Sequence, residues 1–434
     1  MWFAENKSWS QFRRSLGSFS AIVCKDASTV WAEDPYGKTI AQGKAGVDDA
    51  SVIQSALDVL VEGETIFIKA GTYEISETII IKDIKLRGEG RYQTVLKLAD
   101  GANTNLIESK SYHENSPTVE WGIYIEDLYL YGNKTNNATG GAIYLRTWGA
   151  VLRNLRIREF KGHGIAISGV SEQNANENIL ENIDVRFCES SHIVLGTYSS
   201  DNWIINTFSW SPIGASALVL WAGGNLIINS KFETYRTGEI MIIIGGYQNH
   251  IVNCRIAGGN IGIILDGSQS GRLPNKNIII ANQFLRSSTA ISLKGTASNV
   301  QENVIIANRF RTHDYGIIEE GDYTDYNFFV LNRFESDVTN PITIVGANSK
   351  EKLNFGYTTE NSGTATFSGD GTTTQFSIAH GLISTPTKVL VTPMTADAAS
   401  DFYVTADDTN IYINYKSAPP SGTDNLKFSW YAEV

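Results

Sequence analysis

The sequence predicts an all-β chain built around a right-handed parallel β-helix, with a capping helix before it and a small antiparallel β-sandwich after it. An asparagine recurs at nearly constant spacing through the middle of the chain, each repeat contains only short strand-like segments, and the period stops well before the C-terminus. Strands that repeat without intervening helices stack coil upon coil. Parallel crossovers are right-handed almost without exception, which gives the hand of the helix.

The repeat is centred on an asparagine inside a short apolar segment, as in ILENIDV, IINTFSW and IIANRFR. Eight such asparagines follow one another at intervals of 28, 24, 23, 24, 29, 26 and 24 residues: Asn154, Asn182, Asn206, Asn229, Asn253, Asn282, Asn308 and Asn332. A second asparagine precedes most of them by four or five residues: Asn178, Asn202, Asn225, Asn249, Asn277, Asn303 and Asn327. An amide in every coil can bond to its equivalent one coil away, so we interpret both series as structural ladders rather than as glycan ligands.

The two ends of the chain have different patterns. In DDASVIQSALDVL the apolar residues fall on one face of a short helix, which we expect to cover the open end of the β-helix. Near the C-terminus, short alternating strands are separated by turns such as SGDG, DDTN and APPSGT, as in a small antiparallel sandwich. The predicted organisation is an N-terminal segment with the capping helix at 1–63, the β-helix at 64–346, a linker at 347–362 and the sandwich at 363–434.

Composition excludes several classes of function. The net charge is −11 and no basic block is present, which argues against a nucleic-acid partner. No run of apolar residues is long enough to span a membrane. The three cysteines, Cys24, Cys188 and Cys254, form neither a disulfide framework nor a zinc-binding spacing. No cofactor is expected; calcium is left open, although no cluster of aspartate ligands is evident.

Two segments resemble known families. The run from GVDDASVIQSALD through TIFIKAGTYEI to KLRGEG resembles the N-terminal part of pectate-lyase-superfamily proteins, and the resemblance extends over about residues 20–346. That superfamily includes polysaccharide lyases, glycoside hydrolases, sugar epimerases and viral tail-spikes. GDGTTTQFSIAHGL, followed by VLVTP and APPSGT, resembles a C-terminal module of viral tail proteins. The resemblance implies a polysaccharide-directed protein outside the cell or on a virion surface. Because viral spikes of similar fold form parallel trimers, it also implies a homotrimer.

The coil register predicts a charged and aromatic face for an acidic glycan. Two residues beyond the ladder asparagines, Arg156 lies next to Asp184, and alternation directs the residues four beyond outward together. Arginine pairs with uronate and aromatic rings stack on sugars, so this face suits an acidic polysaccharide. The predicted catalytic residues are Asp184, Arg186 and Glu233, and the predicted substrate-binding residues are Arg156, Arg158, Trp210 and Tyr235. For a lyase, the base is left open between Arg186, Tyr235 and His192. A solvated ladder of cross-coil ion pairs explains the same pattern.

A histidine motif and an apolar stripe complete the set of candidates. Gly162-His163-Gly164 resembles the histidine motif of polygalacturonase-type hydrolases, but the preceding coil, NKTNNATGG, lacks the paired aspartates, so we interpret His163 as a turn residue. An apolar row is expected to face outward and to be covered either by the segment Met1–Asp34, with Trp2, Phe3, Trp9, Phe12 and Phe19, or by a second copy. Its members are Val194, Val219, Met241, Ile264 and Ile318.

Two hypotheses of function remain open from the sequence. The first is an enzyme, a lyase or hydrolase that cleaves an acidic polysaccharide along the lateral face. The second is a non-enzymatic tail-spike or adhesin that binds glycan; the missing acid pair and the absence of a signal-like N-terminus favour it. Without such a signal, we expect either a removed leader or export by another route, such as within a virus particle.

Overall fold

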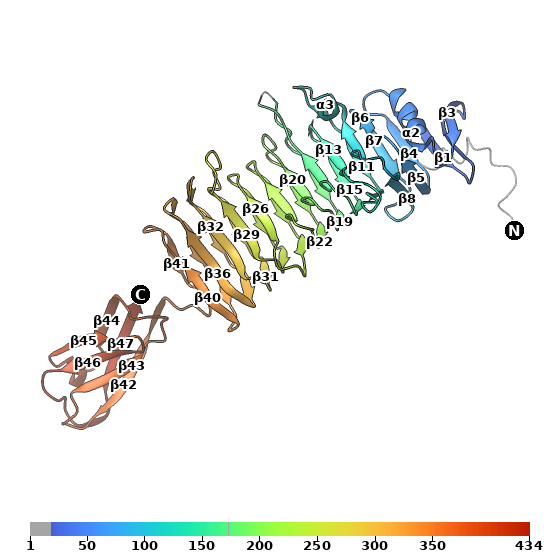
Figure 1. Cartoon of the computed structure of the whole chain (residues 1–434). Coiled ribbons are helices and arrows are strands. Elements are labelled where there is room, and N and C mark those ends of the chain that lie inside the picture. The colour runs from blue at the N-terminus through green and yellow to red at the C-terminus, as the bar shows by residue number, and fades with distance from the viewer. Residues whose placement is uncertain (1–18, 172) are drawn as a thin grey trace, which may run out of the picture.

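The computed structural model, which describes residues 19–171 and 173–434, is a parallel β-helix with a small antiparallel module at its C-terminal end (Figure 1). The predicted fold class is therefore confirmed. Three long sheets run along the solenoid, with 15, 11 and 11 strands, and each full coil gives one strand to each sheet. We call them sheets 1, 2 and 3.

Sheet 1 consists of β1 (Ala21–Lys25), β2 (Thr29–Glu33), β3 (Thr39–Lys44), β4 (Thr65–Ile68), β7 (Lys85–Gly88), β11 (Tyr124–Glu126), β15 (Val151–Arg153), β18 (Ile179–Glu181), β21 (Trp203–Ile205), β24 (Leu226–Ile228), β27 (His250–Val252), β30 (Ile278–Ile280), β34 (Val304–Ile306), β38 (Phe328–Val330) and β41 (Lys350–Lys352). Sheet 2 consists of β5 (Gly71–Ile75), β8 (Thr94–Leu98), β12 (Tyr129–Tyr131), β16 (Arg156–Arg158), β19 (Asp184–Arg186), β22 (Phe208–Trp210), β25 (Lys231–Glu233), β28 (Arg255–Ala257), β31 (Gln283–Leu285), β35 (Arg309–Arg311) and β39 (Arg333–Phe334). Sheet 3 consists of β6 (Ile79–Ile81), β9 (Ile107–Ser109), β13 (Ile143–Leu145), β17 (Ile165–Ile167), β20 (Ile193–Leu195), β23 (Leu218–Leu220), β26 (Ile240–Ile244), β29 (Ile261–Asp266), β32 (Thr289–Lys294), β36 (His313–Glu320) and β40 (Val338–Thr343). Short additions are helix α3 (Lys110–His113) and the pairs β10 (Glu120–Trp121) with β14 (Thr147–Trp148), and β33 (Val300–Gln301) with β37 (Thr324–Asp325).

The N-terminal end of the solenoid is covered by helix α2 (Asp49–Asp58), as predicted. Its apolar face buries Val52, Ile53 and Leu57 in the same core as the first coils. Strands β1 to β3 extend sheet 1 beyond the first coil, because β1 pairs in parallel with β4 and antiparallel with β2. Phe19 packs with Ile22, Cys24 and Phe67; the expected covering residues Trp2, Phe3, Trp9 and Phe12 lie outside the described residues.

The C-terminal module consists of two three-stranded antiparallel sheets around a separate apolar core. One sheet has the order β42–β47–β44 and the other β43–β46–β45. Strand β41 continues sheet 1 into the range interpreted as a linker. The bounds in this module are β42 (Glu360–Gly369), β43 (Gln375–Ala379), β44 (Lys388–Pro393), η1 (Asp397–Ala399), β45 (Phe402–Ala406), β46 (Asn410–Tyr415) and β47 (Gly422–Glu433).

The second asparagine series forms one continuous buried ladder, as predicted. Each side-chain amide donates to the carbonyl oxygen of the next member at 2.8–3.1 Å, from Asn178 to Asn327. The same oxygen accepts the backbone N–H of the preceding member, for example Asn202 from Asn178 at 3.0 Å. Buried amides with all their groups bonded stabilise one register over the alternatives.

The first asparagine series was predicted to form a single ladder, and this prediction is wrong. Up to Asn253 its members occupy a left-handed backbone position, but in the next coil Ala281 occupies that position and Asn282 comes one residue later. There Asn282 is buried and donates to Asn308 at 3.0 Å, while Cys254 is its partner in the preceding coil. The interval of 29 residues, the longest in the series, marks this one-residue slip.

No helix among the described residues is long and apolar enough to cross a membrane.

Candidate functional site

The predicted charged and aromatic face lies on sheet 2, and its register is confirmed. Arg156 pairs with Asp184, and Arg158, Arg186, Trp210 and Glu233 stand side by side on successive strands. Tyr235 follows β25 and is 71% exposed. We call this surface the charged ridge; its residues are Arg156, Arg158, Asp184, Arg186, Trp210, Glu233 and Tyr235.

The first carboxylate of the charged ridge is held by two arginines. Arg186 donates to both oxygens of Asp184, from Nε to Oδ1 at 2.6 Å and from Nη2 to Oδ2 at 3.1 Å. Arg158 donates to Oδ2 at 3.5 Å. Asp184 is buried beneath these groups, so its oxygens serve the protein's own arginines.

The second carboxylate, Glu233, is held by ion pairs rather than by hydrogen bonds, and its buried Oε1 has no hydrogen-bond partner among the described residues. Lys231 lies 3.0 Å from its Oε2 and Arg255 lies 2.8 Å from its Oε1. Trp210 meets Tyr235 edge to face, with ring centroids 5.0 Å apart. The guanidinium of Arg156 lies over the rings of Tyr129 and Tyr92, at 4.6 and 5.0 Å. The ridge therefore provides fixed ion pairs and one aromatic pair in which Tyr235 is exposed and Trp210 is partly buried, and the catalytic roles assigned to Asp184, Arg186 and Glu233 remain predictions.

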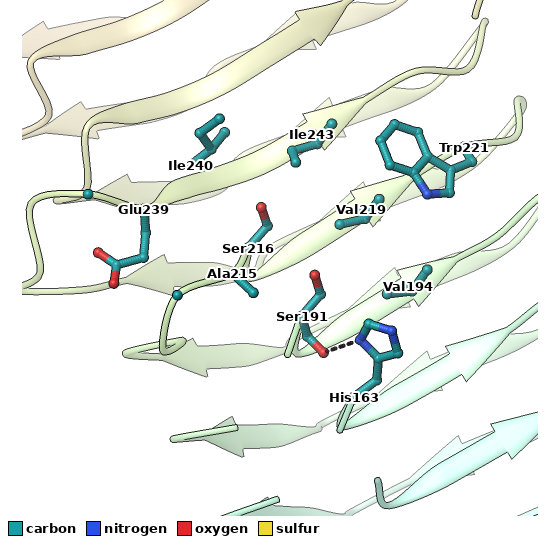
Figure 2. A pocket seen from close by; sticks show the side chains of 12 residues that line it. His163, Ser191, Val194, Ala215, Ser216, Val219, Trp221, Glu239, Ile240 and Ile243 are labelled. Atoms are coloured by element: carbon teal, nitrogen blue, oxygen red, sulfur yellow. Dashed lines mark hydrogen bonds between the residues drawn. The ribbon is translucent and has the colours of Figure 1, made fainter. Parts of the chain in front are cut away.

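A lateral groove of about 620 Å³ lies on sheet 3, around the corner of each coil from the ridge. Figure 2 shows its lining side chains, which come from β20, β23 and β26, from the turns that precede β17, β20, β23 and β26, and from Trp221 just after β23. The lining residues are His163, Ser191, Val194, Gly214, Ala215, Ser216, Val219, Trp221, Gly238, Glu239, Ile240 and Ile243.

The floor of the groove is aliphatic. Val194, Val219 and Ile243 are paired in register on successive strands and point outward. The sequence predicted Met241 at the third position, and this is wrong: Met241 is fully buried in the core. Strand β26 begins at Ile240, two residues before the position that pairs with the start of β23, so a count from the preceding turn falls two residues short. Of the apolar stripe expected on this sheet, Val194 and Val219 thus belong to the floor of a groove, whereas Ile264 and Ile318 lie on later strands outside its lining.

His163 forms one end of the groove, in the turn before β17. Its backbone N–H donates to the hydroxyl of Tyr144 at 3.1 Å, and its Nδ1 lies 3.1 Å from the carbonyl oxygen of Ser191. A carbonyl can only accept, so Nδ1 carries the proton and Nε2 carries the lone pair in the neutral ring. Burial lowers the pKa of the imidazole, against the opposing effect of the bond to Ser191. His163 is a turn residue, as predicted, and it also lines the groove.

Glu239 lies three coils further along, in the turn before β26. It is 8% exposed, and its Oε2 is buried without a hydrogen-bond partner among the residues that the structure describes. In Figure 2 it lies at the same end of the strands as Ala215 and Ser216, across the floor from Trp221. A buried carboxylate oxygen without a partner is rare, because desolvation is costly when no bond replaces water. A hydrogen-bond donor of a ligand could satisfy this oxygen.

Trp221 follows β23 and closes the opposite side. On the next coil, a Cβ at Gly245 would lie 2.6 Å from the Trp221 Cε3, so the absence of a side chain there makes room for the indole. The guanidinium of Arg272 lies 4.0 Å from the indole centroid and is ion-paired with Asp266. The indole is therefore fixed in place beside the aliphatic floor.

The described residues contain no group of three or more His, Cys, Asp or Glu side chains that could hold a metal ion.

Sequence reasoning missed Trp221 and Glu239 as members of a site. Trp221 ends the strand-like run ALVLW and Glu239 stands in the turn YRTGE. The signal that could have pointed to them is positional, since both flank outward residues of the third strand of a coil. A tryptophan at the end of a strand or a glutamate in a turn does not by itself indicate a binding site.

The chain was compared with known families and solved structures. A sequence model of the family described as "Rhamnogalacturonase A/epimerase, pectate lyase-like" matches residues 41–209. No curated protein sequence matches the chain. Among solved structures, the A-module of the Azotobacter vinelandii mannuronan C-5 epimerase AlgE6 is 16% identical, with a TM-score of 0.52 over 72% of this chain and 96% of that one.

Two further structures share the fold. The catalytic domain of a GH87 alpha-1,3-glucanase, solved with nigerose, is 15% identical, with a TM-score of 0.51 over 70% of this chain and 67% of that one. ORF18 of Geobacillus virus E2 is 17% identical, with a TM-score of 0.50 over 88% of this chain and 76% of that one. At these identities the likeness shows a common fold and leaves the chemistry to the site itself.

Proposed function

The chain folds as a pectate lyase-like β-helix, and from this premise we propose that it binds an extracellular polysaccharide along its lateral face, in the groove on sheet 3. The observation that carries the proposal is the groove itself: an aliphatic floor, an indole on one side, the imidazole of His163 at one end, and a buried oxygen of Glu239 without a partner among the described residues. Apolar surface with a few fixed polar groups is typical of carbohydrate sites. Two structures of the same fold are named as a mannuronan epimerase and an alpha-1,3-glucanase, which supports a glycan ligand.

The dimensions of the groove fit a chain molecule. His163 and Glu239 are separated by three coils, which at about 4.8 Å per interstrand step is about 14 Å along the solenoid axis. The groove is open at the surface, and its lining repeats from coil to coil. A linear glycan lying parallel to the axis would pass over the floor between these two residues.

Binding is tested with immobilised extracellular polysaccharides, neutral, acidic and amino-sugar-containing, against the intact chain. We expect saturable binding to at least one of them and its loss in Trp221→Ala. The control is Tyr247→Ala, which removes a half-exposed aromatic ring outside the groove. Equal affinity of Trp221→Ala and the wild type for every bound polysaccharide would contradict the groove as the site.

Cleavage of an acidic glycan on the charged ridge is the second candidate, and the gathering of Arg156, Arg158, Arg186 and Trp210 favours it. Reducing ends and the ultraviolet absorbance of an unsaturated product report hydrolysis and elimination, respectively. The groove contains one carboxylate among its described lining residues, so it lacks the acid pair of a glycosidase. For the groove we therefore expect binding without hydrolysis, as in an adhesin or tail-spike outside the cell or on a virion.

We also propose that copies of the chain associate through sheet 1, as a homotrimer. From β21 to β38 the outward positions of this sheet form two rows of side chains that are apolar except for His250 on β27, and Trp203 and Phe328 in them are 50% and 44% exposed. The rows repeat at the interstrand spacing, so the same rows of a second copy can match them coil by coil. The rows contain Trp203, Leu226, Ile278, Val304 and Phe328, and Ile205, Ile228, Val252, Ile280, Ile306 and Val330.

Mass measurement in solution tests this association. We expect a trimer for the wild type and for Leu390→Lys, which alters an exposed residue of the C-terminal module. Ile228→Lys combined with Ile280→Lys should yield monomers. A monodisperse wild-type monomer at high concentration would overturn the proposal.

A further inference from the structure

The charge of the lateral groove restricts the sugar it can take. Glu239 is the one residue with a formally charged side chain among the described lining residues, and neither lysine nor arginine belongs to that set. Arg272, which packs on Trp221 outside the lining, is already paired with Asp266. A uronate in the groove would lie beside a like charge without a cation to balance it. The groove therefore differs from the charged ridge in the class of glycan it suits.

Resting on the proposed glycan-binding function, we propose that this groove recognises an N-acetylated amino sugar. An acetamido group combines one N–H donor, one carbonyl acceptor and one methyl group in a single planar unit. The groove offers a matching set within two adjacent coils: the buried Oε2 of Glu239 as acceptor, the hydroxyl of Ser216 as donor, and an aliphatic floor.

The aliphatic floor favours an acetamido group over a free hydroxyl or an ammonium group on the sugar. Val194, Val219 and Ile243 are branched aliphatic side chains in three successive coils. Their surface is suited to a methyl group, since removal of both apolar surfaces from water is favourable. A free hydroxyl could bond to Glu239 but would leave the floor in contact with water. An ammonium group would pair with the carboxylate but would have to lose its hydration over an apolar surface.

Glu239 determines the donor side of the recognition. Its Oε2 is buried and has no partner among the described residues, so a ligand N–H that reaches it would supply the hydrogen bond that burial removed. Ser216 lies near it in the preceding coil, and both are seen in Figure 2 at the same end of the floor. Trp221, on the other side, presents a ring for the C–H face of the sugar.

The test compares matched monosaccharides by ligand-observed NMR and calorimetry on the intact chain. Glucose, glucosamine, N-acetylglucosamine and glucuronate form one set, and the galactose and mannose counterparts form two more. We expect the N-acetylated member of at least one set to bind about tenfold more tightly than its hydroxyl counterpart, as for one well-formed buried bond. Saturable binding that favours a uronate or a free amino sugar overturns the proposal, and so does the lack of saturable binding by every N-acetylated sugar.

Variants of Glu239 separate the donor classes. Glu239→Gln keeps a carbonyl oxygen and should retain the N-acetyl preference, whereas Glu239→Ala should lose it. Binding of a sugar with a free ammonium group would instead be lost in both Glu239→Gln and Glu239→Ala. Glu335→Gln, which alters a surface ion pair on other coils, is the control and should bind as the wild type does.

The outcomes distinguish this inference from the proposed function. If Trp221→Ala abolishes polysaccharide binding but the groove prefers uronates, the substrate class is wrong and the groove is still the site. If Trp221→Ala binds every polysaccharide as the wild type does, the groove itself is wrong.

Discussion

The charged ridge on sheet 2 and the lateral groove on sheet 3 lie on neighbouring faces of the same coils, and they use polar residues in opposite ways. The ridge has many charged side chains, but Asp184 accepts hydrogen bonds from two arginines, and Glu233, although its Oε1 lacks a hydrogen bond among the described residues, is ion-paired with Lys231 and Arg255. The groove has few polar side chains, yet Glu239 has a buried oxygen without a described partner, and His163 has a lone pair on Nε2. The number of charged side chains on a face therefore does not show how many of them are free to bind a ligand.

This difference follows from the geometry of a parallel sheet. Residues in register on adjacent coils are about 4.8 Å apart, close enough for opposite charges to pair. A row of mixed charges therefore neutralises itself, and its net contribution to binding is small. A carboxylate in a turn, displaced from such rows, has no neighbour in register to pair with it.

The largest expected effect is on affinity, and it separates the two faces directly. Trp221→Ala should lower the affinity for the bound polysaccharide by about thirtyfold or more, as for a buried aromatic anchor. Arg186→Ala should change it by less than about threefold, because that arginine serves Asp184. Calorimetry or biolayer titration measures both. A larger loss in Arg186→Ala than in Trp221→Ala would make the ridge the site.

The next effect tests how the backbone shapes the groove. In Gly245→Ala the new Cβ would lie 2.6 Å from Cε3 and 2.8 Å from Cζ3 of Trp221, so the indole must move. We expect about a tenfold loss of affinity, which corresponds to about 1.4 kcal/mol. Gly238→Ala is the matched control, since this glycine lines the groove but a Cβ there meets nothing within 4 Å. Equal affinities of the two variants would show that the indole position is unimportant.

The fold could be predicted from the sequence because its signal is periodic. The buried ladder from Asn178 to Asn327 recurs in every coil, and one amide bonded to the next satisfies buried polar groups in only one register. The register of Arg158, Arg186, Trp210 and Glu233 followed from it correctly. Where one coil departs from the period, prediction failed: the slip after Asn253 and the early start of β26 moved Asn282 and Met241 from their expected places.

The site could be predicted only in part, because partners are not visible in a sequence. Arg and Asp on adjacent coils suggested a binding face, but whether they bind each other or a ligand depends on side-chain geometry. Glu239 shows the converse: it was not predicted as a site residue, because nothing in the segment YRTGE indicates that the turn buries its carboxylate away from hydrogen-bond donors. Trp221 lines a groove because Gly245, a whole coil later, has no side chain.

A moderate effect on stability is expected for the ridge. Asp184→Ala leaves the guanidinium groups of Arg158 and Arg186 without their shared carboxylate, and these side chains are only 19% and 28% exposed. We expect a loss of about 1–3 kcal/mol in the free energy of unfolding, with polysaccharide affinity unchanged. Urea unfolding monitored by circular dichroism measures the first quantity. Glu302→Ala, which removes an exposed ion pair with Lys276, should cost little.

The smallest effect is on the pH dependence of stability, and it concerns the groove. Burial lowers the pKa of His163 in the folded chain, so the unfolded chain binds the proton more readily. Stability from this group is therefore complete above the unfolded value of about 6.5 and is lost as the pH falls below it. His163→Gln keeps a neutral polar side chain at every pH, so the difference in unfolding free energy between wild type and variant should shift against the wild type on acidification. His192 and His313 also have lowered pKa values, but they are present in both proteins and their effects cancel in the difference. A difference that stays constant from pH 8 to well below 6.5 would mean that His163 is as hydrated in the fold as it is in the unfolded chain, which would contradict the burial of its ring at the end of the groove.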